Sequence, residues 1–113
     1  MVTADEVRQL AVSLPRSEER LVGDRVKFRV GQYVYLAFSR DEKFMGFAFP
    51  KEERAALVAA EPDKFQLPAR ADLRYNWVQV SLAAIDADEM RELVVDAWRM
   101  VVPKRVAEAY RDL

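Results

Sequence analysis

The sequence predicts an α+β domain in two layers, an antiparallel sheet of about five strands with helices packed on one face. Three observations predict it. Segments at both ends have apolar residues at helical spacing, the middle of the chain alternates with a period of two, and short turns join its strands. Parallel strands need crossovers of about a dozen residues or more, so these connections favour hairpins over a doubly wound sheet.

We expect the 113 residues to form one domain. At 51% hydrophobic and 33% charged, the chain has enough apolar side chains for a core, which excludes a disordered protein. The N-terminus lacks the basic and apolar regions of a signal peptide. No apolar run approaches the roughly 20 residues that span a bilayer. These features predict a cytoplasmic protein with no membrane partner.

The first predicted element is a helix over about residues 4–14. Thr3 and Glu6 have the spacing of a capping box, in which a hydroxyl and a carboxylate each accept from a backbone N–H at the helix start. Pro15 ends the helical pattern. The charged residues 16–20 predict a polar connector.

Four apolar or alternating stretches follow and are predicted strands: residues 21–22, 25–30, 33–39 and 44–49. Gly23-Asp24 and Gly31-Gln32 are turn dipeptides between them. The last stretch is apolar on both faces, so we expect an interior strand. Within it, Gly46 indicates a bulge or a close backbone approach.

The register at Gly31-Gln32 has two alternatives. A strict two-residue turn places the basic residues of one strand on the same face as the apolar residues of the next. A three-residue loop or a bulge restores the pattern by grouping four apolar residues: Val26, Phe28, Val34 and Leu36. We expect the bulged version.

In the second half, Pro50 opens a predicted helix that ends near Ala60, with Glu52 and Glu53 in its first turn. Residues 63–76 predict a loop with a short strand at 64–67, and residues 77–82 predict a strand. Asp86 and Glu89 predict a capping box for the longest helix, whose buried stripe is Met90, Leu93, Val94, Ala97 and Val101.

Pro103 breaks or kinks that helix, and residues 104–111 predict a final helical stretch. Trp77 and Trp98 are interpreted as core anchors rather than binding platforms. The other predicted core residues come from the inward faces of the helices and strands: Leu10, Leu14, Phe28, Leu36, Leu93, Val94 and Ala97.

The sequence has no Cys and no His. This excludes disulfides, thiolate nucleophiles, a Ser-His-Asp triad, and Cys- or His-ligated metals. The acids Asp86, Asp88 and Glu89 stand at a helix start, where carboxylates act as caps rather than as a Mg²⁺ or Ca²⁺ site. We expect no enzymatic activity, no cofactor and no transition metal.

Eighteen Lys and Arg against 19 Asp and Glu give a net charge of −1, which argues against strong non-specific attraction to nucleic acid. A local cluster stands out: Arg25, Lys27 and Arg29 share one strand face, and Tyr33 and Tyr35 follow across the hairpin. Cations beside aromatic rings suit phosphate contacts and base stacking. Alternatively, the charges keep a solvated strand from pairing with other chains.

A second basic run comprises Arg99, Lys104 and Arg105 near the end of the longest helix. These side chains would also contact phosphates. Alternatively, they complement the negative end of the helix dipole.

Four segments resemble the MmcQ/YjbR family of small bacterial proteins: Ser13-Leu14-Pro15, the hairpin from Gly23 to Gly31, Trp77-Val78-Gln79-Val80, and the stretch from Asp96 to Arg105. The resemblance covers nearly the whole chain. Leu21-Val22 stand where members often have a His-Trp pair, which puts any ligand role of that pair in doubt here.

The resemblance implies an α-β(3–4)-α-β(2)-α sandwich, similar to type III secretion chaperones and related to the CyaY-like shape. It also implies DNA binding through a double-wing arrangement, an inference by structural analogy. The matching residues that would touch phosphate are Lys27, Arg29, Lys104 and Arg105. No cofactor or catalytic residue is implied.

Two hypotheses follow. The first is weak nucleic-acid (DNA) binding through the basic strand face, by a monomer or weak dimer. The alternative is a protein- or small-ligand-binding module resembling a type III secretion chaperone, with no nucleic-acid binding. A contiguous positive face favours the first. Exposure of Trp77, Phe47 or Phe49 in one patch favours the second.

Overall fold

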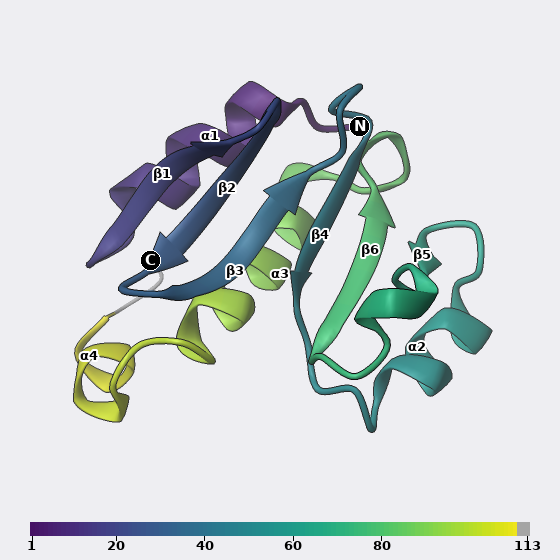
Figure 1. Cartoon of the computed structure of the whole chain (residues 1–113). Coiled ribbons are helices and arrows are strands. Elements are labelled where there is room, and N and C mark those ends of the chain that lie inside the picture. Colours follow the sequence, from purple (N-terminus) through teal and green to yellow (C-terminus); the bar gives the residue numbers. More distant parts are fainter. Residues whose placement is uncertain (111–113) are drawn as a thin grey trace.

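A computed structural model describes residues 1–110 of the chain. Six strands form the sheet: β1 (Ser17–Val22), β2 (Arg25–Val30), β3 (Tyr33–Phe38), β4 (Phe44–Ala48), β5 (Phe65–Gln66) and β6 (Trp77–Ser81). The helices are α1 (Ala4–Ser13), α2 (Arg54–Ala60), α3 (Ala87–Arg99) and α4 (Lys104–Ala109), with 3₁₀ turns η1 (Arg70–Asp72) and η2 (Leu82–Ala84). Figure 1 shows this arrangement, which confirms the predicted α+β class.

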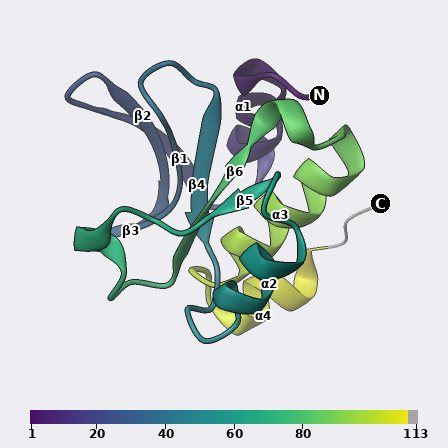
Figure 2. The ribbon, with the colours of Figure 1, turned by 90° about the vertical axis from the view of Figure 1, so that its right-hand side faces the viewer.

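The strands pair antiparallel throughout, in the order β1-β2-β3-β4-β6-β5. The four α-helices lie on one side of this sheet, and η1 stands out on the other side (Figure 2). One face of the sheet is therefore covered by helices. The opposite face, which we call the open face, is the one toward the viewer in Figure 1.

The core lies between the sheet and the helices. Most predicted core residues are buried there: Leu10, Leu14, Phe28, Leu36, Val94 and Ala97. Trp98 is fully buried, as predicted, and its indole N–H donates to the carbonyl of Pro15 at 2.8 Å. Leu93 is only partly buried, because the inner face of α3 runs through Met90, Val94, Val95, Ala97 and Trp98. Val101, also partly buried, lies beyond the end of α3.

The helix ends follow local chemistry. Thr3 and Glu6 make the predicted capping box of α1. Asp86 accepts from the Glu89 N–H at 2.8 Å and so caps α3. The predicted box at this end is wrong, because the Glu89 carboxylate binds Lys64 Nζ at 3.0 Å instead.

In the second half of the chain, the start of α2 differs from the prediction and the end of α3 agrees with it. The prediction that Pro50 opens α2 is wrong, since a turn closed by Glu53 N and Pro50 O precedes the helix. Pro103 separates α3 from α4, as predicted. The predicted last helical stretch extends to residue 111, which lies outside the described residues.

Residues 17–20, predicted as a polar connector, belong to strand β1. This strand pairs with β2 on one side and forms the free edge of the sheet on the other. Five of its six residues are exposed, so it lacks the apolar alternation by which strands are recognised. Its charges are typical of an edge strand, where they discourage pairing with other chains.

The β2–β3 hairpin combines both alternatives considered from the sequence. Val30 pairs with Tyr33 across a strict two-residue turn, and the register then shifts between Phe28 and Arg29. The shift leaves Tyr35 as an extra residue in β3, and Phe28 pairs with Leu36. The predicted grouping therefore holds for Phe28 and Leu36 but not for Val34, which pairs with Arg29.

Candidate functional site

The register places one row of side chains straight across the open face. Residues paired across antiparallel strands share a face. The pairings connect Arg20, Lys27, Ala37, Gly46, Gln79 and Gln66 in this order from β1 to β5. The centre of this middle row has almost no side-chain bulk, since it consists of Ala37 and Gly46. The indole of Trp77 occupies the space over Gly46, and the row has its cationic side at β1 and β2.

The β1–β2 hairpin presents four cations to the open face: Arg20, Arg25, Lys27 and Arg29. Glu18, which pairs with Arg29 in the register, is the acid among them. Its carboxylate lies 3.1 Å from Arg20 Nη2 and 3.7 Å from Arg29 Nε. Lys27 has no hydrogen-bond or ion-pair partner within residues 1–110. The strand cations therefore outnumber their acid, which leaves this part of the face positive.

The predicted stacking residue Tyr35 does not join this face. It is fully buried on the helical side, because the bulge turns it inward together with Leu36. Its hydroxyl lies 2.6 Å from Ser17 Oγ. Burial raises the pKa of Tyr35 to about 12, against a smaller lowering by the Ser17 hydrogen bond. Tyr33 is exposed and stands at the turn opposite Val30.

The second basic run is separated from the strand cations. Lys104 and Arg105 are exposed on α4, which packs on the helical side through a 5.1 Å ring contact between Tyr110 and Trp98. Arg99 pairs with Asp96 within α3 at 3.1 Å. The structure thus brings Arg25, Lys27 and Arg29 together but places Lys104 and Arg105 on the other side of the sheet (Figure 2).

The interpretation of Trp77 as a core anchor is wrong. Trp77 pairs with Ala48 on the open face and is half-buried there, against Gly46. A Cβ on Gly46 would lie 2.5–2.8 Å from three atoms of the indole, Nε1, Cε2 and Cζ2. The expected close approach at Gly46 is therefore made by an aromatic side chain. Phe47 is buried in the core and Phe49 is half-buried, so neither forms an exposed patch with Trp77.

A groove of about 730 Å³ opens beside Trp77. It begins where β3 and β4 part, since their pairing ends at Leu36 and Phe47. One side carries Arg25 and Lys27, the other carries Trp77, Tyr75, Asn76 and Asp72, and Ala37 and Ala48 lie between. This volume is typical of a small-molecule site.

Arg54 holds the aromatic side of the groove in place. This arginine of α2 is 8% exposed and donates to the backbone carbonyls of Leu73, Tyr75 and Trp77. Arg54 was not among the site residues predicted from the sequence. Its signal is that it is the one charged residue in the segment 54–60, which is otherwise alanine and aliphatic residues.

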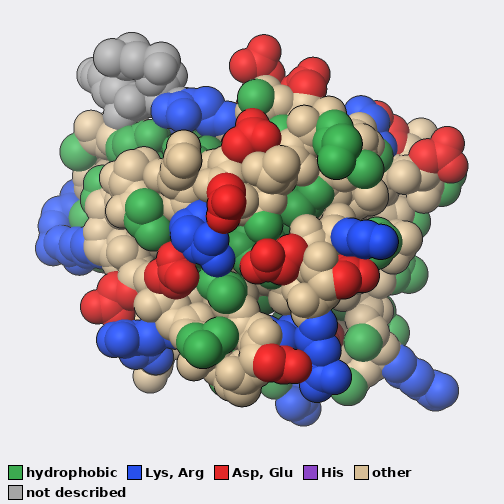
Figure 3. Space-filling view, turned by 90° about the horizontal axis from the view of Figure 1, so that it is seen from above, with side chains coloured by type: hydrophobic (Ala, Val, Ile, Leu, Met, Phe, Trp, Pro, Cys, Tyr) green, Lys and Arg blue, Asp and Glu red, His purple; other side chains and the backbone are tan. Residues whose placement is uncertain are grey.

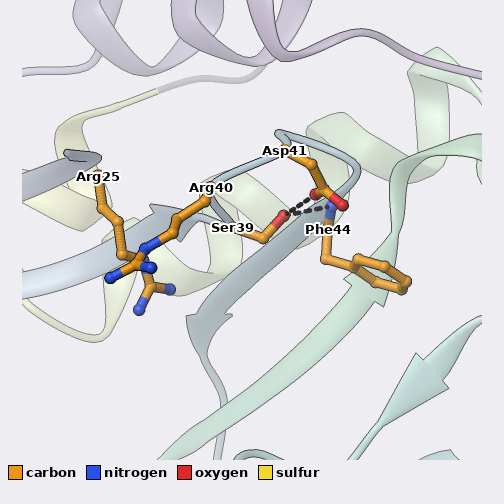
Figure 4. A pocket seen from close by; sticks show the side chains of 5 residues that line it. All are labelled: Arg25, Ser39, Arg40, Asp41 and Phe44. Atoms are coloured by element: carbon orange, nitrogen blue, oxygen red, sulfur yellow. Dashed lines mark hydrogen bonds between the residues drawn. The ribbon is translucent and has the colours of Figure 1, made fainter.

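A second, shallower hollow of about 440 Å³ adjoins the strand cations at the top of the sheet. The side chains of Arg25 and Arg40 converge in it, next to a turn built on Ser39 (Figure 4). Ser39 Oγ donates to Asp41 at 2.7 Å and accepts from Phe44 N at 3.1 Å. The Ser39 hydrogen bond, helped by the Lys43 N–H, lowers the pKa of Asp41. Arg40 is paired with Asp24 at 3.3 Å.

Elsewhere the surface charge is mixed. Seen from above, acidic and basic side chains alternate, while Lys and Arg gather at the lower rim, the side of the open face (Figure 3). Residues 1–110 contain no group of three acids arranged to hold a metal ion. Of the predicted acid cluster, Asp86 is a cap and Glu89 pairs with Lys64. The described helices include none that is long and apolar enough to cross a membrane.

Comparisons with known proteins agree on one family. A family model described as YjbR matches residues 12–100. A crystal structure of Deinococcus radiodurans protein DR2400, with the family-model domain DUF419, superposes with a TM-score of 0.78. It is 23% identical and covers 93% of this chain and 82% of its own, a likeness that shows the fold. No curated protein matches the chain.

Proposed function

The chain belongs to the YjbR family, and from this premise we propose that it binds nucleic acid weakly through the open face of its sheet. The observation that carries the proposal is the cluster of Arg20, Arg25, Lys27 and Arg29 on a face that none of the α-helices within residues 1–110 covers. Cations spaced along a strand suit the regular negative charges of a phosphate backbone.

The proposed contact uses the strand cations rather than the whole surface. The net charge of −1 gives little long-range attraction, so we expect weak binding that depends strongly on salt. In a double-wing arrangement, the two wings would be the hairpins β1–β2 and β3–β4. The cations then place the phosphate contacts on the first wing.

The test removes three positive charges from each of two surfaces. One variant carries Arg25→Gln, Lys27→Gln and Arg29→Gln on the open face. The matched control carries Arg99→Gln, Lys104→Gln and Arg105→Gln on the helical side, so both variants have the same net charge. Glutamine keeps much of each aliphatic stem, and unfolding by urea checks that both variants fold.

We expect the strand variant to lose most binding to a labelled oligonucleotide, while the control binds like the parent. The slope of log K against log salt should flatten by about 0.7–0.9 for each lost phosphate contact. Equal loss in both variants would show that only net charge matters and would contradict the proposed site.

A second candidate function is binding of a small ligand without nucleic acid. It is favoured by the half-buried Trp77 in a groove of about 730 Å³. In that case the parent protein would bind no oligonucleotide at low salt, and the groove would still take up small aromatic compounds.

A further inference from the structure

The groove on the open face has an aromatic side and a cationic side that face each other across small residues. Lys27 pairs with Ala37 and Ala37 pairs with Gly46, so Lys27 stands two strand spacings, about 10 Å, from the glycine under Trp77. A nucleotide has the same two-part chemistry, since a flat apolar ring is joined through a sugar to a phosphate.

The Trp77 ring is prepared for stacking. The edge of the indole that carries Nε1, Cε2 and Cζ2 lies against Gly46, and the residue also lines the groove. Its Nε1 has no hydrogen-bond partner among the described residues. Arg54 fixes the backbone of Trp77 and of Tyr75, and Tyr75 is 51% exposed. A ring that is already held in place loses little freedom on binding.

The charges that line the groove determine which end of a bound nucleotide lies at which side. Asp72 lines the groove on the side of Trp77, and Arg25 and Lys27 line the opposite side. Arg74 lies over the Tyr75 ring, 4.8 Å from its centroid, so the aromatic side also has a cation next to it. The cations that line the groove itself are Arg25 and Lys27, so a phosphate in the groove is attracted to their side, which leaves the base next to Trp77.

We propose that this groove binds an unpaired nucleotide of a single strand, with its base stacked on Trp77 and its phosphate beside Lys27 and Arg25. The inference rests on the proposed function and adds that the preferred nucleic acid is single-stranded. In a duplex, each base is paired and stacked on its neighbours and offers no free ring face. In a single strand the ring face is accessible, and stacking tolerates any base.

The experiment compares three ligands with the full chain. These are a labelled single strand of about 12 nucleotides, within the range of known single-strand sites, its duplex, and an abasic strand with the same number of phosphates. The deoxy and ribo forms of the single strand are both titrated. Similar affinities for the two forms support the proposal, because stacking does not use the 2′-hydroxyl, and strong binding of one form alone would contradict it.

We expect the single strand to bind about tenfold more tightly than the abasic strand or the duplex. Trp77→Leu should remove this advantage and leave binding of the abasic strand unchanged, while Trp77→Phe should retain most of it. Stacking of a base on the ring should quench the fluorescence of Trp77. Trp98 is fully buried, so its emission should not respond and serves as an internal reference.

The outcomes separate this inference from the proposed function. If no ligand binds, both fail. If all three ligands bind equally and Trp77→Phe and Trp77→Leu behave like the parent, the basic face binds phosphates but the stacking site is wrong. The comparison of the intact with the abasic strand needs only the parent protein, so a variant that misfolds does not remove the test.

Discussion

The indole of Trp77 in β6 lies against the backbone of Gly46 in the neighbouring strand β4, in the space that any other side chain at position 46 would occupy. Glycine is therefore required at this position by an aromatic ring. The contact keeps the ring on the open face and out of the core. It also sets the position of one side of the groove.

The first prediction concerns this contact. Gly46→Ala should displace the Trp77 ring, because the new Cβ would lie 2.5 Å from Nε1. Overpacking of this kind costs about 1–3 kcal/mol of unfolding free energy. Urea unfolding measures the loss, and adding Trp77→Ala should recover part of it, since the clash is then gone. A single variant with the stability and tryptophan emission of the parent would contradict the contact.

A second prediction concerns Arg54, whose guanidinium satisfies three backbone carbonyls in and next to the loop before β6. Arg54→Met keeps the stem but leaves these carbonyls without their donor, which should cost about 1–3 kcal/mol. Hydrogen exchange should rise in residues 73–77 more than in α1. The matched control is Arg70→Met, an exposed arginine in η1. If exchange rises equally across the chain, Arg54 stabilises the whole fold rather than this loop.

The third prediction tests the core. Leu36 is fully buried opposite Phe28, so Leu36→Ala should lower the free energy of unfolding by about 2–5 kcal/mol. Leu93→Ala should cost less, because Leu93 is only partly buried. Leu67→Ala, at an exposed position, is the control and should change stability by less than about 0.5 kcal/mol. Equal losses at Leu36 and Leu67 would mean that the core is misplaced.

Much of the fold was predictable because its signals are local. The capping box of Thr3, the alternation of β2 and the break at Pro103 each depend on a few neighbouring residues. Strand β1 was missed because an exposed edge strand has no apolar alternation, and only its pairing with β2 reveals it. The turn and the bulge of the β2–β3 hairpin were both anticipated, but not that they occur together.

The candidate site was only partly predictable. A strand places alternate residues on one face, so the grouping of Arg25, Lys27 and Arg29 follows from the sequence. The position of Trp77 does not, because it depends on which strand lies beside β6 and on the glycine in that strand. Likewise Tyr35 was assigned to the wrong face, since one extra residue in a strand reverses the direction of its side chain.

The last prediction is a pH dependence that comes from Tyr35. Its pKa is about 12 in the folded protein, mainly because of burial, against 10 for an ordinary tyrosine. Below pH 10 the phenol is protonated in both states and contributes no slope. Between pH 10 and 12 the unfolded chain loses this proton while the folded protein keeps it, so stability falls as pH rises, by about 1.4 kcal/mol for each pH unit.

Tyr35→Phe removes the titrating group, and with it the hydrogen bond to Ser17. At neutral pH the variant should be less stable than the parent by about 0.5–1.5 kcal/mol, the usual contribution of one hydrogen bond. Above pH 10 the difference should shrink and then reverse, because only the parent loses stability from ionisation of this phenol in the unfolded state. Urea unfolding of both proteins from about pH 8 to 12 measures the difference, which also cancels the titration of all other groups. A difference that stays constant over this range would show that Tyr35 titrates alike in the folded and unfolded chain, and the buried position of its hydroxyl would then be wrong.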